Sequence, residues 1–297
     1  MQRSTGRCVR LVALVAIGLL AIGRGWAGAR GFLREAAANP PPSLTATPGL
    51  IPFAKGSLAK LKSSDAAEIK VGLDDARLSA KAALPAVPVI IDLLQNGLPF
   101  SLVESAIDAL GDIESEQASA TLSFYARHRS VVIRRSAVKA LVRTKGTLAV
   151  KVLRTALSDE DGMVRGVAAI GLGTLHAKDA LGDLFLALDH RVNEAAVSIG
   201  ELCGSNECDS LEGRLGRVPF DVITSGLDPL LFRPPVEVSD DAKVKLIGRL
   251  RELGTAEANK FLRDTEARWP KSGSERVKRA LQQGIQATAG GARSGGS

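Results

Sequence analysis

One stretch of the sequence decides the fold: residues 157–175, which read LSDEDGMVRGVAAIGLGTL. It begins with a short acidic turn and continues into a run rich in alanine, glycine and leucine. Val164, Ala168 and Leu172 recur four residues apart, which places them on one face of a helix. The acidic residues before them suit a helix cap and the positive end of the helix dipole. The stretch therefore predicts a loop followed by an amphipathic helix.

Similar phrases recur along the chain. ESAIDALGDI, RSAVKALVRT, GVAAIGLGTL and EAAVSIGEL begin at residues 104, 135, 166 and 194. Each has an alanine followed four residues later by a large apolar residue, and these pairs are Ala106 and Leu110, Ala137 and Leu141, Ala168 and Leu172, and Ala195 and Ile199. A further match, RLRELGTAEA, places Leu253 in the position of Leu110. A period of about 20–50 residues indicates stacked repeats that share a continuous core.

The repeated phrase resembles the HEAT-like repeat of the phycobilisome-lyase type. The residues that carry the resemblance are Asp161, Val164, Arg165, Ala168, Ala169, Leu172 and Gly173, and more weakly Ile133, Arg134, Ala137 and Leu141. It extends over about residues 65–270 and implies an all-α fold, a HEAT-like α-α superhelix (solenoid) of about five to six helix pairs. The class includes protein scaffolds, chromophore lyases, alkylpurine DNA glycosylases and an iron hydroxylase, so the resemblance selects no single function.

Composition divides the chain into six segments. We expect a signal peptide, a Pro-rich linker or arm, HEAT-like repeats, an irregular apolar insertion, C-terminal helices and a disordered Gly/Ser-rich tail, over residues 1–29, 30–64, 65–212, 213–241, 242–286 and 287–297 respectively. This order of segments predicts a solenoid that is interrupted by a Pro-rich irregular insertion.

The N-terminus has the pattern of a secretory signal. Arginines precede an apolar run at 11–23, and Ala27-Gly28-Ala29 follows it. The run is shorter than the roughly 20 residues that a membrane span needs. We therefore expect a periplasmic or secreted protein. The alternative is an uncleaved signal that stays as an N-terminal membrane anchor.

The basic charge of the chain lies at its ends. The formal net charge is +7, but four arginines lie within 1–29, and five basic residues against one glutamate follow residue 270. Residues 30–270 therefore carry a formal charge of −1. A nucleic-acid binder needs a basic surface on its folded body, so this balance favours a protein partner and argues against nucleic acid.

The sequence has no motif for catalysis or for a cofactor. It lacks a G-x-S-x-G elbow, a phosphate-binding loop and an H-E-x-x-H pair. His128, Asp159 and His190 recur 31 residues apart, but neighbouring units lie about 8–10 Å apart, too far to share one metal ion. We therefore expect no enzyme activity, no cofactor and no metal.

Two sets of residues are candidates for structural roles. Arg134 and Arg165 occupy one repeat position, and we expect them to form a ladder with loop carboxylates such as Asp161; the alternative is an anion site. Cys203 and Cys208 flank one turn, and in an oxidising compartment we expect them to form a disulfide.

The segment 213–241 contains four prolines and many large apolar residues. Proline disfavours a pair of regular helices there. One interpretation is a plug that replaces a lost unit. The other is an exposed partner-binding loop, with contact residues Phe220, Leu231, Phe232 and Arg233.

The function expected from the whole sequence is an exported, non-catalytic scaffold for protein–protein interaction, and the alternatives are an enzyme of the HEAT-like lyase class or a membrane-tethered spacer.

Overall fold

The computed structural model describes residues 51–291. The expected signal segment, most of the expected linker and residues 292–297 lie outside this range. The elements within it are α1 (Lys55–Leu61), α2 (Ala66–Ser79), a 3-10 helix (Ala80–Ala86), α3 (Val87–Asn96), α4 (Phe100–Ile113), a 3-10 turn (Glu116–Ala118), α5 (Ser119–Tyr125), α6 (Val131–Thr144), α7 (Thr147–Ala156), α8 (Gly162–Thr174), a 3-10 turn (Lys178–Ala180), α9 (Leu181–Asp189), α10 (Ala195–Leu202), α11 (Ser205–Glu212), α12 (Phe220–Phe232), α13 (Asp240–Leu253), α14 (Ala256–Arg268) and α15 (Glu275–Gly291). The described part contains no strand, and the all-α prediction is confirmed.

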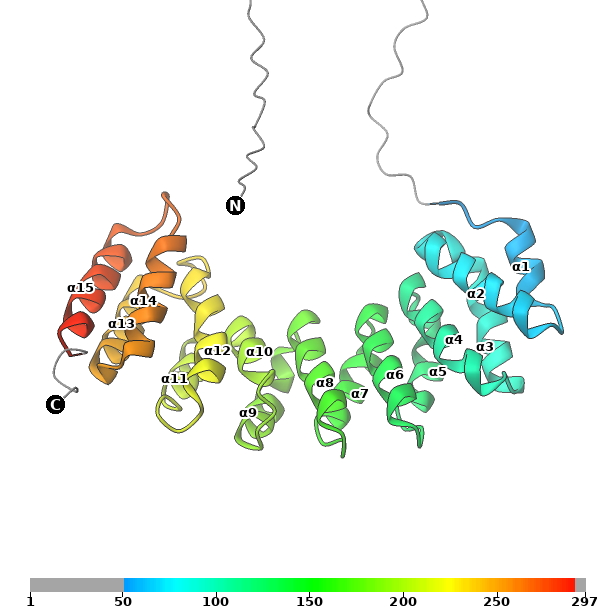
Figure 1. Ribbon diagram of the computed structural model, residues 1–297, viewed down its shortest axis with the longest axis horizontal. Coiled ribbons are helices and arrows are strands. Elements are labelled where there is room, and N and C mark those ends of the chain that lie inside the picture. Colours follow the sequence, from blue (N-terminus) through cyan, green and yellow to red (C-terminus); the bar gives the residue numbers. More distant parts are fainter. Residues whose placement is uncertain (1–50, 292–297) are drawn as a thin grey trace, which may run out of the picture. The chain divides into compact units, whose positions relative to one another are not determined.

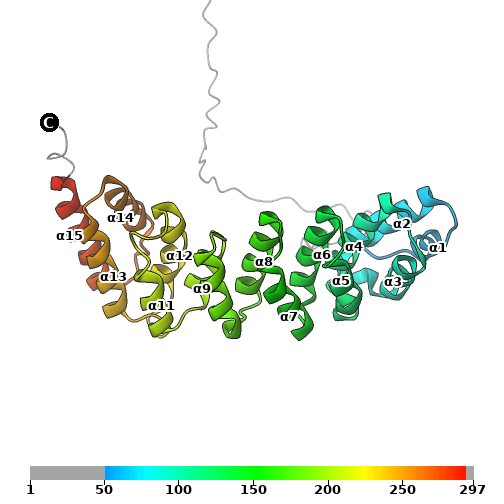
Figure 2. The same cartoon turned by 90° about the horizontal axis from the view of Figure 1, so that it is seen from below.

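The helices form two rows (Figure 1). The first helices of successive units, α2, α4, α6, α8, α10 and α12, each pack on the next. The second helices, such as α5, α7 and α9, each pack on the first helix of the following unit, and Figure 2 shows several of them on one side of the first row. The turns that lead from a second helix to the next first helix share one border, here called the loop edge, which comprises residues 126–130, 157–161, 190–194 and 213–219.

Small residues allow the first helices to approach closely. The alanines and the larger apolar residues of the repeated phrase are all fully buried, namely Ala106, Leu110, Ala137, Leu141, Ala168, Leu172, Ala195 and Ile199. A Cβ atom added to Gly111 of α4 would lie 2.8 Å from the Cβ of Ala140 in α6. The contact between α10 and α12 is tighter, because a Cβ on Gly200 would lie 1.8 Å from the carbonyl oxygen of Gly226. These positions cannot hold a larger side chain without separating the helices.

The N-terminal part of the described range departs from the expected linker. Residues Lys55–Leu61 form α1, which packs on α2 and buries Leu61. The stretch Ala66–Asn96 is long and apolar enough to cross a membrane by length and composition alone, a test that core helices of soluble proteins also pass. Here the stretch is divided by the 3-10 helix, which has a φ of 45° at Ala80 and contains Pro85. It packs against α1 and α4 as part of the core.

The expectation of an irregular insertion at 213–241 is wrong for residues 220–232. These residues form α12, which includes Pro229 and continues the first row by packing on α10. The buried side chains Val222, Ile223, Leu227, Leu230 and Leu231 share one helical face, and their burial outweighs the cost of the proline.

The C-terminal helices differ from the expected repeat in two ways. Leu250, not Leu253, is buried in α13; Leu253 is 37% exposed at the helix end, so the expected register there is wrong. Helix α15 packs on both α13 and α14 and extends to Gly291, so the first residues of the expected disordered tail are helical.

The Gly200–Gly226 contact gives a direct test of the packing. Gly200→Ala should destabilise the protein by about 3 kcal/mol or more, because the added methyl group meets a backbone oxygen that cannot move independently. Gly248→Ala in α13 is the matched control: its Cβ would meet nothing within 4 Å, and alanine favours the helix by up to about 1 kcal/mol. The measurement is the urea midpoint of each variant. Equal midpoints for Gly200→Ala and the wild type would contradict the close contact.

Candidate functional site

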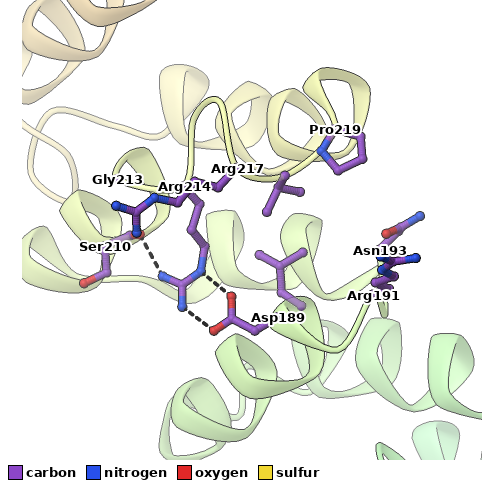
Figure 3. Close-up of a pocket in the computed structure, with 10 residues that line it drawn as sticks. Asp189, Arg191, Asn193, Ser210, Gly213, Arg214, Arg217 and Pro219 are labelled. Carbon is purple, nitrogen blue, oxygen red and sulfur yellow. Dashed lines mark hydrogen bonds and ion pairs between the residues drawn. The ribbon is translucent and has the colours of Figure 1, made fainter.

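A groove of about 950 Å³ lies on the loop edge, where the turn before α10 faces the turn before α12 (Figure 3). One wall comes from residues 188–193 and the other from residues 210–219. Its lining residues are Leu188, Asp189, Arg191, Asn193, Ser210, Gly213, Arg214, Arg217, Val218 and Pro219. The groove therefore joins two neighbouring units of the array.

Arg214 holds the two walls together. Its guanidinium donates hydrogen bonds to both carboxylate oxygens of Asp189, at 2.8 and 2.7 Å, and a third to the carbonyl oxygen of Ser210 at 2.9 Å. It also lies over the ring of Phe185, 4.6 Å from the ring centroid. The hydrogen bonds from Arg214 lower the pKa of Asp189, so this carboxylate stays ionised at neutral pH. Arg214 therefore serves to fix the groove.

Arg191 and Arg217 face the groove from opposite walls and are exposed. Within residues 51–291 neither guanidinium forms an ion pair with a carboxylate. Arg191 has a φ of 66°, a left-handed conformation that few non-glycine residues adopt. With Arg214 neutralised by Asp189, these two arginines leave the groove with an excess of positive charge. Their planar forks suit bidentate binding of carboxylates.

A second cavity of about 630 Å³ lies beside Glu212, between the end of α11 and α13. The Glu212 side chain is buried, and its Oε2 atom accepts no hydrogen bond from any described residue. The guanidinium of Arg249 lies 3.9 Å away. Burial raises the pKa of Glu212, against the opposing effect of nearby Lys245 and Arg249. Glu212 is thus the one described carboxyl group that combines burial, a raised pKa and a cavity, although no group of three or more His, Cys, Asp or Glu that could hold a metal occurs among the described residues.

The expected arginine ladder exists in one unit only. Arg134, whose side chain is 8% exposed, donates to both oxygens of Asp159 at 2.9 Å and also to Glu160. Arg165 reaches no carboxylate among the described residues and instead donates to the carbonyl oxygens of Asp159 and Glu160. Asp161 is the N-cap of α8, where its side chain accepts a hydrogen bond from the Val164 amide. Both guanidinium groups are engaged by hydrogen bonds within the protein, which argues against an anion site at either arginine.

Cys203 and Cys208 form a disulfide across the turn from α10 to α11, with Cα atoms 5.2 Å apart. Both side chains are buried. The main-chain oxygen of Cys203 also accepts a hydrogen bond from Arg233 at 2.7 Å. This junction ties the end of α10 to the segment that follows α12.

The four residues expected to bind a partner are mostly engaged inside the fold. Leu231 is fully buried, so the hypothesis of an exposed binding loop is wrong for it. The Phe220 ring packs edge-on against Phe261 at 6.4 Å, and the Phe232 ring lies 5.6 Å from that of Trp269. Arg233 caps α10 and pairs with Glu237 at 3.0 Å. The segment therefore occupies the place of a repeat unit in the array, as the plug interpretation holds, and it does so as a helix.

Sequence reasoning did not identify the groove. Arg191, Arg214 and Arg217 belong to none of the sites predicted from the sequence. The available signal was the pair of arginine-containing turns, HRVN and GRLGR, at successive positions of the loop edge. Nothing in the spacing shows which of these arginines is paired and which is free.

The buried carboxyl of Glu212 predicts a pH-dependent stability difference. In the unfolded chain a glutamate titrates near pH 4.3, whereas burial raises the pKa of Glu212 in the fold. As the pH rises from the pKa of glutamate in the unfolded chain through the higher pKa of Glu212 in the folded protein, the wild type loses stability. The loss occurs because the buried carboxyl must ionise. Glu212→Gln cannot ionise, so it should gain stability relative to the wild type as the pH rises from 4 toward 8. Urea unfolding across this pH range measures the difference, with Glu252→Gln, exposed on the same cavity, as the control. A difference that is constant or grows on acidification would contradict this account.

The chain is similar to one known family of repeats and to several solved structures. The family of HEAT repeats matches residues 87–173. The complex of CpcE and CpcF of phycocyanin lyase from Nostoc sp. PCC7120 is 18% identical, with 88% of this chain and 99% of that chain covered and a TM-score of 0.42. The designed armadillo repeat protein YIII(Dq)4CqI is 14% identical, with 78% and 98% covered and a TM-score of 0.37. None of the curated proteins compared matches the sequence. The helix packing shows that the described part of this chain is an all-helical solenoid, and its residues 87–173 match the family of HEAT repeats.

Proposed function

We propose that the protein is an exported, non-catalytic scaffold that binds an acidic segment of a partner protein in the groove between residues 188–193 and 210–219. The observation that carries the proposal is the pair of exposed arginines, Arg191 and Arg217, on facing walls of a groove that the Arg214–Asp189 pair holds open. A rigid array that presents such loops is a common arrangement for binding.

The chemistry of the groove favours carboxylates. Each free arginine offers a fork of N–H donors that matches a carboxylate, and two of them on opposite walls can hold an extended acidic segment between them. Because both arginines are exposed, salt screens their attraction, and binding should weaken as ionic strength rises. The formal charge of −1 on residues 30–270 supports a protein partner over nucleic acid.

Export is supported by the N-terminal arginines and apolar run and by the Cys203–Cys208 disulfide, which suits an oxidising compartment. If the signal is not cleaved, the scaffold is tethered to the membrane by residues 1–29. Mass spectrometry of the mature N-terminus separates the two forms, since cleavage near residue 29 removes about one-tenth of the chain.

An enzyme of the HEAT-like lyase class is the second candidate, and Glu212 is the observation in its favour. A buried carboxyl group with a raised pKa beside a cavity can act as a general acid or base. The described part of that cavity adds Lys245, Arg249 and Glu252 but no histidine, cysteine or hydroxyl nucleophile. The scaffold remains the better-supported function.

The groove is tested with a fluorescein-labelled decaglutamate peptide and fluorescence anisotropy. The wild type should bind the peptide with a salt-sensitive affinity, and the double variant Arg191→Glu/Arg217→Glu should bind at least ten times more weakly. The matched control is Arg251→Glu/Arg263→Glu, which makes the same change in net charge at exposed positions of α13 and α14. Circular dichroism checks that all variants keep the fold. Equal loss of binding in the two double variants would show that net charge alone is responsible and would overturn the groove.

A further inference from the structure

Four rings lie in sequence on the surface near the first turn of the loop edge. The rings of Phe124 and Tyr125 meet edge to face at 5.4 Å, and Tyr125 stacks on His128 at 6.1 Å. His128 in turn stacks on Phe100, the first residue of α4, at 6.2 Å. We call Phe100, Phe124, Tyr125 and His128 the aromatic cluster.

The exposure of this cluster is unusual for the protein. Aromatic residues make up only 4% of the sequence, and the core is built from alanine, leucine, valine and isoleucine. Phe124 is 73% exposed and Phe100 is 63% exposed. Every other aromatic side chain whose burial is described is at least partly covered, for example Phe185 beneath Arg214 and Phe232 against Trp269. Large apolar groups exposed together indicate an interaction surface.

A hollow of about 390 Å³ opens beside the cluster. Its walls are Leu94 and Gln95 of α3 and Ala120, Thr121, Phe124 and Tyr125 of α5. The Tyr125 hydroxyl donates a hydrogen bond to the carbonyl oxygen of Leu94 at 2.9 Å, which ties the two helices together at this wall. The hollow is therefore held in shape and has a volume near the lower limit of about 300 Å³ for binding pockets.

Two exposed arginines adjoin the cluster. Arg127 and Arg129 lie on either side of His128, and both are exposed. In the described part of the chain neither side chain pairs with a carboxylate, and the hollow itself is lined by no acidic residue. Arg127 is the second residue of its turn on the loop edge (126–130), as Arg191 is of its own turn (190–194). An acidic segment with a large apolar side chain complements this surface in both charge and polarity.

We propose that the aromatic cluster and its hollow form a docking site that receives a phenylalanine or leucine side chain from an acidic segment of a partner protein. The apolar side chain enters the hollow between α3 and α5 and lies against Phe124, while the flanking carboxylates pair with Arg127 and Arg129. The proposal rests on the scaffold function but uses none of the residues of the groove between α9 and α12.

The test uses two labelled peptides, acetyl-Glu-Glu-Phe-Leu-Glu-Glu-amide and the same peptide with both apolar residues replaced by alanine. Tyr125 is the sole tyrosine of the chain, so selective tyrosine labelling gives one ring signal in the NMR spectrum. The first peptide should shift this signal in a saturable manner, and the alanine peptide should bind at least ten times more weakly by anisotropy. If both peptides bind equally, the contact is only electrostatic and the docking site is wrong.

Variants separate this site from the rest of the surface. Phe124→Ser should weaken binding at least tenfold and leave the unfolding midpoint unchanged, because the ring is exposed. Ala120→Trp, which fills the hollow from an exposed position of α5, should weaken binding to a similar extent. Leu186→Ser removes another exposed apolar side chain, 59% exposed in α9, and should have no effect.

The groove variant Arg191→Glu/Arg217→Glu should still shift the Tyr125 signal with this peptide. Loss of the shift in that variant would show that the peptide occupies the groove and would overturn the separate site, whereas failure of decaglutamate to bind the groove would leave the shift intact. Wild-type affinity in Phe124→Ser, or binding without any change at Tyr125, would also overturn the proposal.

Discussion

The structure depends on the close approach of successive first helices. Alanine and glycine at the crossing points bring α4, α6, α8, α10 and α12 into direct contact, and larger residues on either side then fill the remaining space. Dispersion and the burial of apolar surface stabilise such contacts only when the helices lie within about 8–10 Å of one another. A core made in this way needs few aromatic side chains. The rings that the chain does contain are therefore available for its ends and its surface.

The repeat could be predicted from the sequence because the spacing of small and large residues follows directly from this contact. Ala106, Ala137 and Ala168 share one period and one environment. Helix α12 could not be predicted in the same way, because Pro229 is a strong local signal against a helix. The apolar residues around it do follow helical spacing, and their burial against α10 decides the outcome. Local preference yields to tertiary packing at this position.

The candidate site was harder to predict because it depends on arginines that look alike in the sequence. Arg134 is buried against Asp159, Arg165 binds main-chain oxygens, and Arg214 links two turns through Asp189. Of the arginines that line the groove, Arg191 and Arg217 remain available to a ligand, and this follows from which carboxylates lie within reach in three dimensions. The disulfide was easier to foresee, because two cysteines five residues apart on one turn have few other partners.

The junction after α10 has a mechanical consequence. In an array whose units touch only their neighbours, a load applied to the two ends passes through every interface in turn, as through links in series. At the junction, two ties join α10 to α12 in parallel: the Gly200–Gly226 contact and the cap that Arg233 places on the end of α10. Under tension the array should therefore part among its regular repeats and keep the junction between α10 and α12 intact.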